Sequence, residues 1–144
     1  MKIKDGAKVF IKNDRLGKYL FQLRDNKPTI PNPNTYGLVG GGIEAEEVPI
    51  EALKRELEEE TNLTVSNIES LGNKEVTNVM KEEGEQLVKS RLYVFLAHTE
   101  KELEDIVLNE GQKLAYFTID EALNLPNLSP PIREVIDEYR EKLS

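Results

Sequence analysis

The stretch GGGIEAEE (residues 40–47) decides the fold, together with the segment that follows it, VPIEALKRELEEETNL (residues 48–63). Apolar Ile50, Leu53 and Leu57 recur at helical spacing in the second segment, and Pro49 is suited to a first helical position. Residues 51–60 are nearly all strong helix formers. The sequence therefore predicts a glycine-rich turn that runs into an amphipathic helix.

This helix carries several carboxylates along one edge. At about 100° per residue, Glu56 and Glu60 lie side by side and Glu59 lies on their outer flank. Like charges at this spacing each destabilise a helix by about 0.2–0.5 kcal/mol, and acids in its last turn oppose the helix dipole. Arg55 can reach Glu59 and Glu51, but Glu56 and Glu60 remain beside the apolar face. A divalent cation such as Mg²⁺ or Mn²⁺, which prefers carboxylate oxygen and water, is the expected counter-ion.

The same residues resemble the Nudix box, whose pattern is G-x5-E-x7-R-E-U-x-E-E-x-G-U with U apolar. One fixed position differs, because Asn62 stands where the family has glycine. Asparagine tolerates the left-handed backbone conformation well, so we expect Asn62 to end the helix as glycine would. The matching residues are Gly41, Glu47, Arg55, Glu56, Leu57, Glu59, Glu60 and Leu63.

The resemblance implies a fold, a reaction and a set of site residues. The implied fold is an α/β/α sandwich in which a curved mixed sheet lies between the box helix and a C-terminal helix. The implied reaction is metal-dependent hydrolysis of the pyrophosphate linkage in a nucleoside diphosphate joined to another group. Arg55 would orient the glutamates, Glu47 would brace the loop, and Gly41 would let the chain approach its ligands. The implied metal ligands are Glu56, Glu59, Glu60 and the backbone carbonyl of Gly40.

The base that activates water is a separate question. Glu110 precedes Gly111 and Gln112 ahead of an aromatic strand, and this segment resembles a loop of many Nudix enzymes whose glutamate joins the metal site. The competing interpretation is one more exposed acid. Either Glu56 or Glu110 can serve as the base, and family members differ on this point. A carboxylate bound to the metal is a poor base, and one linked to it through a water is better placed. Glu56 is the preferred candidate.

Two residues outside the box are candidates for substrate binding. Arg24 follows the second predicted strand, where its cation could meet a phosphate, but a solvated arginine is an equally good interpretation. Residues 25–36 hold three prolines and form a loop that could cover the site. Tyr36 ends this loop and could offer an aromatic face to a base. The alternative for Tyr36 is a side chain packed in the core.

The rest of the chain reads as strands followed by a helical end. Gly72 interrupts the strand pattern of residues 65–79, and residues 81–85 form a turn between two strands. Thr118 or Asp120 can cap a short helix, and an amphipathic helix ends the chain. The predicted strands are 7–12, 18–23, 65–79, 87–97 and 114–117, and the later predicted helices are 118–123 and 132–143.

Length and composition narrow the class of protein. The 144 residues predict a single domain over 1–144, and 19 basic against 27 acidic residues give a net charge of −8. This balance argues against binding to nucleic acid or to an anionic membrane. The chain has no cysteine, which excludes thiol catalysis and zinc–thiolate sites. Residues 1–4 do not resemble a signal peptide, so we expect a cytoplasmic protein with a small-molecule nucleotide partner, and a homodimer is compatible with the sequence.

Three hypotheses for function follow. The first is a hydrolase that converts a nucleoside triphosphate, oxidised or not, to the monophosphate, with ADP-ribose, nucleotide sugars and dinucleoside polyphosphates as alternative substrates. The second is a catalytically silent nucleotide-binding module, although no box glutamate is lost. The third is a helix whose acids only aid solubility, which leaves the glycines, Glu47 and Arg55 unexplained. The sequence does not choose the substrate, the P–O bond cleaved or the number of metal ions.

Overall fold

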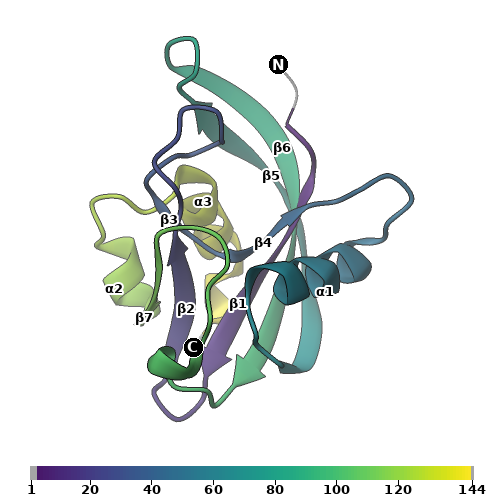
Figure 1. Ribbon diagram of the computed structural model, residues 1–144, viewed down its shortest axis with the longest axis vertical. Helices are drawn as coiled ribbons and strands as arrows, with labels where there is room; N and C mark the ends of the chain where they lie inside the picture. Colours follow the sequence, from purple (N-terminus) through teal and green to yellow (C-terminus); the bar gives the residue numbers. More distant parts are fainter. Residues whose placement is uncertain (1–2, 144) are drawn as a thin grey trace.

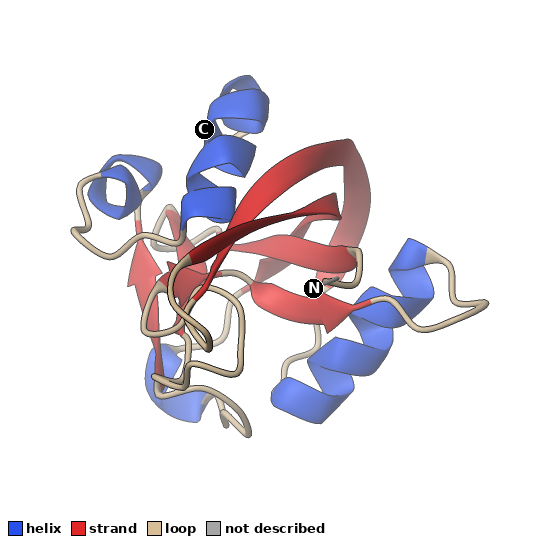
Figure 2. Ribbon diagram, turned by 90° about the horizontal axis from the view of Figure 1, so that it is seen from above, coloured by secondary structure: helices blue, strands red, loops and turns tan. Residues whose placement is uncertain are grey.

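The computed structural model describes residues 3–143, which build one seven-stranded sheet with helices on both of its faces (Figures 1 and 2). The helices are α1 (Pro49–Glu60), α2 (Ile119–Leu123) and α3 (Pro130–Tyr139), with 3-10 turns at Leu103–Asp105 and Arg140–Lys142. The strands are β1 (Gly6–Asn13), β2 (Lys18–Leu23), β3 (Tyr36–Gly37), β4 (Val39–Gly42), β5 (Ser66–Met80), β6 (Gln86–Thr99) and β7 (Lys113–Phe117).

The sheet is mixed, as expected. Its main path runs β3-β2-β1-β6-β5, while β4 pairs with β1 and β7 pairs with β2. The β1–β6 pair is parallel and all the other strand pairs are antiparallel. β4 pairs with the first half of β1, opposite Gly6 to Val9. This pairing places the glycines of β4 beside the strand that precedes them by some thirty residues.

Two apolar layers hold the helices to the sheet. Successive residues of a strand point to opposite faces, and β1 shows this directly. Val9 packs in the layer that includes Leu53 of α1, whereas Phe10 packs in the layer that includes Ile136 of α3. The sheet therefore lies between α1 on one side and α3 on the other, which confirms the predicted sandwich (Figure 2).

Several element ends are shifted, and the last helix spans Pro130–Tyr139 where 132–143 was predicted. Three further predictions of local structure differ from the structure. The glycines of the predicted turn form β4 instead, because pairing with β1 outweighs the low strand propensity of glycine. Gly72 does not break its strand: β5 continues through it with an irregular register between Ser70 and Gly72. The helix does not end in a left-handed Asn62. It ends at Thr61, whose backbone is extended, and the Asn62 side chain accepts a hydrogen bond from Val107 N at 2.9 Å.

Among residues 3–143, none of the helices has the length and apolar character that crossing a membrane requires.

Candidate active site

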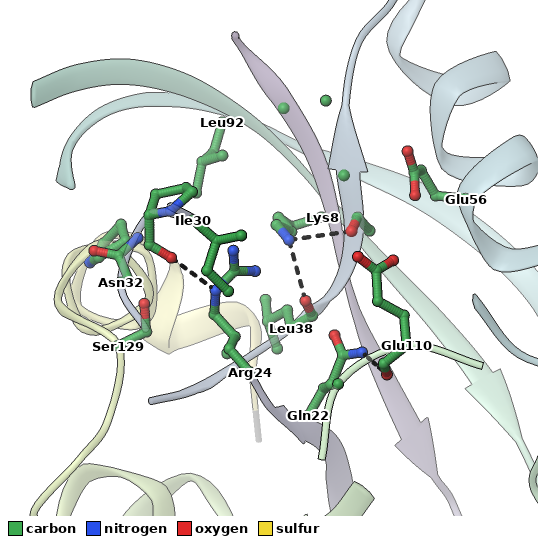
Figure 3. Close-up of a pocket in the computed structure, with 18 of the residues that line it drawn as sticks. Lys8, Gln22, Arg24, Ile30, Asn32, Leu38, Glu56, Leu92, Glu110 and Ser129 are labelled. Carbon is green, nitrogen blue, oxygen red and sulfur yellow. Dashed lines mark hydrogen bonds between the residues drawn. The ribbon is translucent and has the colours of Figure 1, made fainter. Parts of the chain in front are cut away.

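A cavity of about 570 Å³ lies where β1, β2 and β4 meet α1 and the loop after β2. Figure 3 shows this cavity with acidic side chains on one side, Lys8 in the middle and the residues of the proline-rich loop on the other side. Of the residues predicted for the site, all but Tyr36 and Glu47 line it. The predicted residues at the cavity wall are Arg24, Gly40, Gly41, Arg55, Glu56, Glu59, Glu60 and Glu110.

Two glycines of β4 permit close approaches, Gly41 to α1 and Gly40 to β1. A Cβ atom on Gly41 would lie 2.4 Å from Cδ of Glu56, so only glycine leaves room for that carboxylate. Gly40 has φ +136°, and a Cβ atom there would lie 2.0 Å from the Ala7 carbonyl oxygen. The glycines therefore set the Glu56 carboxylate against the backbone of β4.

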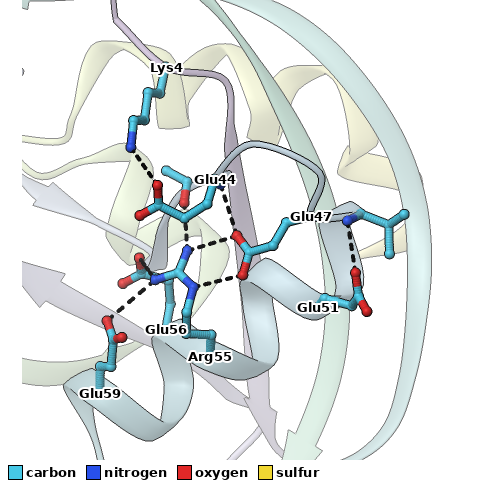
Figure 4. Close-up of polar contacts among 9 residues, drawn as sticks. Lys4, Glu44, Glu47, Glu51, Arg55, Glu56 and Glu59 are labelled. Atoms are coloured by element: carbon cyan, nitrogen blue, oxygen red, sulfur yellow. Dashed lines mark hydrogen bonds and ion pairs between the residues drawn. The ribbon is translucent and has the colours of Figure 1, made fainter.

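Arg55 ties the loop before α1 to the helix (Figure 4). Its guanidinium donates to both carboxylate oxygens of Glu47, at 2.8 and 3.0 Å, and to the carbonyl oxygen of Gly42 at 2.9 Å. It also donates to Glu56 at 2.9 Å and to Glu59 at 3.4 Å. Hydrogen bonding to Arg55 is the main reason that the pKa of Glu47 falls to about 2. The bracing of the loop by Glu47 thus has a geometric basis.

The predicted reach of Arg55 to Glu51 is wrong. The Glu51 carboxylate accepts a hydrogen bond from Val48 N at 3.0 Å and so closes the first turn of α1. Arg55 turns instead toward Glu47, which offers it a bidentate partner.

The three box glutamates on α1 lie in three environments. Glu59 is exposed, Glu56 is mostly buried and held by Arg55, and Glu60 is only 3% exposed. Oxygen Oε1 of Glu60 is buried without a hydrogen-bond partner. Burial raises the pKa of Glu60 to about 8, against an opposing effect of the nearby Lys8 ammonium. A buried carboxylate oxygen with no partner is costly, and a cation would satisfy it.

Glu110 reaches the cavity through contacts of its backbone. Its carbonyl oxygen accepts a hydrogen bond from Gln22 Nε2 at 2.7 Å (Figure 3). Gln112 N donates to the Leu23 carbonyl oxygen at 2.8 Å. Between them, Gly111 has φ +89°, and a Cβ atom there would lie 2.8 Å from Gln22 Nε2. The loop is therefore attached to β2, and the structure brings Glu110 to the same cavity as Glu56.

Lys8 is a cavity residue that the sequence analysis missed. Its ammonium donates to the carbonyl oxygens of Leu38 and Gly40, at 3.3 and 3.2 Å. Burial, and then the Arg24 cation, lower the pKa of Lys8 to about 8. In the sequence, Lys8 alternates with the apolar residues of the predicted strand 7–12. Because both faces of β1 are covered, a lysine between its apolar residues was the signal that could have identified it.

Tyr36 is not at the cavity. It is 8% exposed and meets the Phe117 ring edge-to-face, with 5.3 Å between the centroids. The packing alternative therefore fits the structure, and the predicted contact with a base does not. Arg24 does line the cavity, where its Nε donates to the Pro31 carbonyl oxygen at 3.0 Å. The loop after β2 thus positions Arg24.

The oxygen atoms at this wall suit a hard divalent cation. In the described part of the chain, 3–143, no three acidic or histidine side chains converge as a ready metal site. The reason is that Arg55 holds Glu56 and Glu59 while Glu60 lies deeper. The partnerless Oε1 of Glu60 and the Glu56 carboxylate packed on Gly41 nevertheless fit Mg²⁺ or Mn²⁺.

Comparison with known proteins agrees with this geometry. The family model described as NUDIX domain matches residues 2–139. No curated protein matches the sequence.

Several solved structures are similar in fold. A MutT protein from Methanosarcina mazei Go1 has a TM-score of 0.70 at 19% identity, covering 98% of this chain and 95% of that one. The E. coli dihydroneopterin triphosphate pyrophosphohydrolase has 0.72 at 16% identity, covering 99% of each chain. The NUDIX domain of Shewanella oneidensis NrtR, complexed with ADP ribose, has 0.71 at 18% identity, covering 100% and 90%.

Proposed function

The chain belongs to the Nudix domain family, and from this premise we propose that it is a pyrophosphohydrolase that uses Mg²⁺ or Mn²⁺ to split the diphosphate linkage of a nucleotide. The observation that carries the proposal is the charge distribution of the cavity. Carboxylates of Glu56, Glu60 and Glu110 face the cations of Lys8 and Arg24 across it. A diphosphate with its metal ions places positive charge against the carboxylates and negative oxygens against the cations.

The residues of the box act by holding oxygen atoms in place. Glu56, Glu59 and Glu60 would hold the metal ions, which neutralise the diphosphate and lower the pKa of a bound water when present. The carbonyl of Gly40, the further predicted ligand, accepts a hydrogen bond from Lys8 in this structure. Arg55 fixes the orientation of Glu56 through its 2.9 Å contact. Glu47 keeps Arg55 in this position, so that the loop and the helix present their ligands together.

The proton of the attacking water goes to a carboxylate. Glu56 and Glu110 both line the cavity and both remain candidates for the base. Glu56 accepts a hydrogen bond from Arg55, which fixes the direction of its carboxylate, while the carbonyl of Glu110 is fixed by Gln22. We retain Glu56 as the preferred base. A Glu56→Gln variant should then lose more of kcat than a Glu110→Gln variant, in stopped assays of product release with saturating Mg²⁺.

The favoured substrate class is a nucleoside triphosphate, with loss of diphosphate to give the monophosphate. Similar structures carry names that widen the choice to ADP-ribose and to dihydroneopterin triphosphate. No residue that lines the cavity within 3–143 is aromatic, so selection of the organic group would rest on shape and hydrogen bonding. Candidate groups for this role are Asn32, Asn78, Ser90 and Ser129.

The test is a substrate panel with purified protein. Nucleoside triphosphates, oxidised deoxynucleotides, ADP-ribose, nucleotide sugars, dinucleoside polyphosphates and dihydroneopterin triphosphate are incubated with Mg²⁺, Mn²⁺ or EDTA, and products are separated by chromatography. We expect metal-dependent turnover of at least one class, abolished in the double variant Glu59→Gln, Glu60→Gln. Equal rates for variant and wild type would refute the metal site.

The second candidate function is a nucleotide-binding module without catalysis. It is favoured only by the arrangement of the glutamates, which do not converge as a ready metal site in the described residues 3–143. A wild-type chain that binds nucleotides in calorimetry but leaves the whole panel intact would establish this function instead.

A further inference from the structure

Lys8 projects from β1 into the cavity with part of its hydrogen-bonding capacity unused. A lysine ammonium has three hydrogens to donate. Two are accounted for by the carbonyl oxygens of Leu38 and Gly40. Within the described residues 3–143, no third acceptor contacts the Lys8 ammonium. One N–H is therefore available to a ligand in the cavity.

The surroundings of Lys8 keep its charge uncancelled at short range. Among residues 3–143 it forms no ion pair with a carboxylate, although Glu56, Glu60 and Glu110 act on it electrostatically. Arg24 lies on its other side, with its guanidinium held by the Pro31 carbonyl oxygen (Figure 3). Two cations thus line the cavity, and within the described residues neither forms an ion pair with a carboxylate.

Keeping two like charges close together in a half-buried place is unfavourable unless an anion joins them. The carboxylates cannot serve as that anion while they hold metal ions. A phosphate oxygen of the substrate can, because it can contact the cations on one side and the metals on the other.

We propose that Lys8 is a substrate-binding residue that donates to a non-bridging oxygen of the diphosphate, beside Arg24. The inference rests on the proposed function, whose metal-bound diphosphate it positions. Lys8 is fixed by two backbone carbonyls of the segment 38–40, so the contact is set by the sheet and not by the mobile end of a long side chain.

The test uses Lys8→Met, which keeps an unbranched side chain as far as Cε and removes the ammonium, and Lys8→Arg, which keeps the charge. Lys12→Met is the matched control, because Lys12 lies on the same strand, outside the cavity lining, over the Tyr19 ring at 6.0 Å. Thermal melts and circular dichroism first establish that each variant is folded. Calorimetry then measures the binding of imidodiphosphate in the presence of Mg²⁺. This diphosphate analogue has a P–N–P bridge, which resists hydrolysis.

We expect Lys8→Met to weaken imidodiphosphate binding by about tenfold to a hundredfold, the range for a hydrogen bond to a charged group. Lys8→Arg should retain most of the affinity, and Lys12→Met should match the wild type. On a hydrolysed substrate, Lys8→Met should raise KM more than it lowers kcat. Binding of Mg²⁺ alone should not weaken.

Equal affinities of wild type and Lys8→Met for imidodiphosphate would overturn the inference. So would a loss of Mg²⁺ binding without diphosphate, because Lys8 would then belong to the metal site. A wild-type chain that binds imidodiphosphate through Lys8 and yet hydrolyses nothing in the panel would overturn the proposed function and leave this inference standing. Metal-dependent hydrolysis with the same kinetic constants in wild type and Lys8→Met would support the proposed function and overturn this inference.

Discussion

Glu60 is the residue at which burial and charge are most opposed. Its folded pKa of about 8 lies above the ordinary 4.5, so between these values the folded chain binds more protons than the unfolded chain. This contribution to stability is present at low pH and is lost as the pH rises toward 8. In EDTA, we therefore expect the melting temperature of the wild type to fall from about pH 5 to pH 8 relative to that of Glu60→Gln.

A second melting experiment adds Mg²⁺ at pH 8. The wild type should recover stability because the ion binds the folded state, and Glu60→Gln should recover less. Glu58→Gln, which changes an exposed acid of the same helix, is the control and should follow the wild type. Melting curves that shift in parallel with pH for wild type and Glu60→Gln would mean that Glu60 is ionised equally in both states.

At the scale of single residues, the acidic residues of the cavity were easier to predict from the sequence than the basic ones. Helical spacing alone grouped Glu56, Glu59 and Glu60, because the period of a helix fixes which side chains share a face. Lys8 was missed because alternation in a strand does not tell whether the second face is covered. Tyr36 was predicted to contact the nucleobase of the substrate, but it packs against Phe117, which lies eighty-one residues away in the sequence.

The loop and first turns of α1 behave as one element because Arg55 bridges them. We expect Arg55→Met to lower Mg²⁺ affinity about tenfold to a hundredfold, since it removes the group that orients Glu56 and joins Glu47 to Gly42. Isothermal titration measures the affinity. Hydrogen exchange should also become faster in residues 42–48.

Lys54→Met provides the matched control, because Lys54 is an exposed neighbour on the same helix. It should leave Mg²⁺ affinity unchanged. Unchanged exchange of residues 42–48 in Arg55→Met would show that the loop is held by other contacts.

Gly72 of β5 packs against Tyr139 of α3. Its φ is +131°, and a Cβ atom there would lie 2.8 Å from the Tyr139 hydroxyl oxygen. We expect Gly72→Ala to lower the free energy of unfolding by about 1–3 kcal/mol, from backbone strain and displacement of Tyr139. Chemical denaturation measures the change. Gly37→Ala, whose added Cβ meets nothing closer than 3.8 Å, should be much less costly, and an equal loss in both variants would contradict this account.

Element types were predictable from local pattern, while the exact ends were not. The strand over Lys18–Leu23 was predicted with its observed bounds, because turn residues flank it on both sides. β4 was missed because its three glycines carry no strand signal, and only its partner β1 makes it a strand. The end of α1 at Thr61 likewise depends on a contact from another segment, since Thr61 forms a bridge with Leu108.

Across the whole molecule, the loop after β2 is joined to the β5–β6 hairpin by a buried polar contact. Asn78 accepts a hydrogen bond from Asn32 at 3.0 Å and donates to Ser90 at 2.8 Å. Asn78→Ala should lower the free energy of unfolding by about 1–3 kcal/mol, because Asn32 and Ser90 lose a buried partner. Urea denaturation measures this.

The same substitution should raise KM, since Asn32, Asn78 and Ser90 all lie at the cavity. Asn73 lies on β5, as Asn78 does, and Asn73→Ala removes an exposed contact with Arg91 of β6. This substitution should change the free energy of unfolding by less than about 0.5 kcal/mol. Equal effects of the two substitutions would mean that the buried network adds nothing to the attachment of the loop.

The layered fold was predictable because helix and strand periods, together with the box, specified which faces are apolar. The arrangement of the residues around the cavity was less predictable. Glu110 entered the prediction through a short local pattern, yet its place depends on Gln22 and on the conformation of Gly111, both set by tertiary contacts. Residues that reach the site through backbone contacts of distant segments leave little trace in one sequence.

The segment that carries Glu110 also completes the end of α1. Asn109 donates from its backbone to the Glu60 carbonyl oxygen at 2.8 Å and from its side chain to the Glu59 carbonyl oxygen at 3.2 Å. A chimera that imports only the box helix from a relative would therefore arrive with unmatched terminal carbonyls. Residues 107–112 should be transplanted together with the helix, so that Glu110 keeps its position relative to Glu56, Glu59 and Glu60.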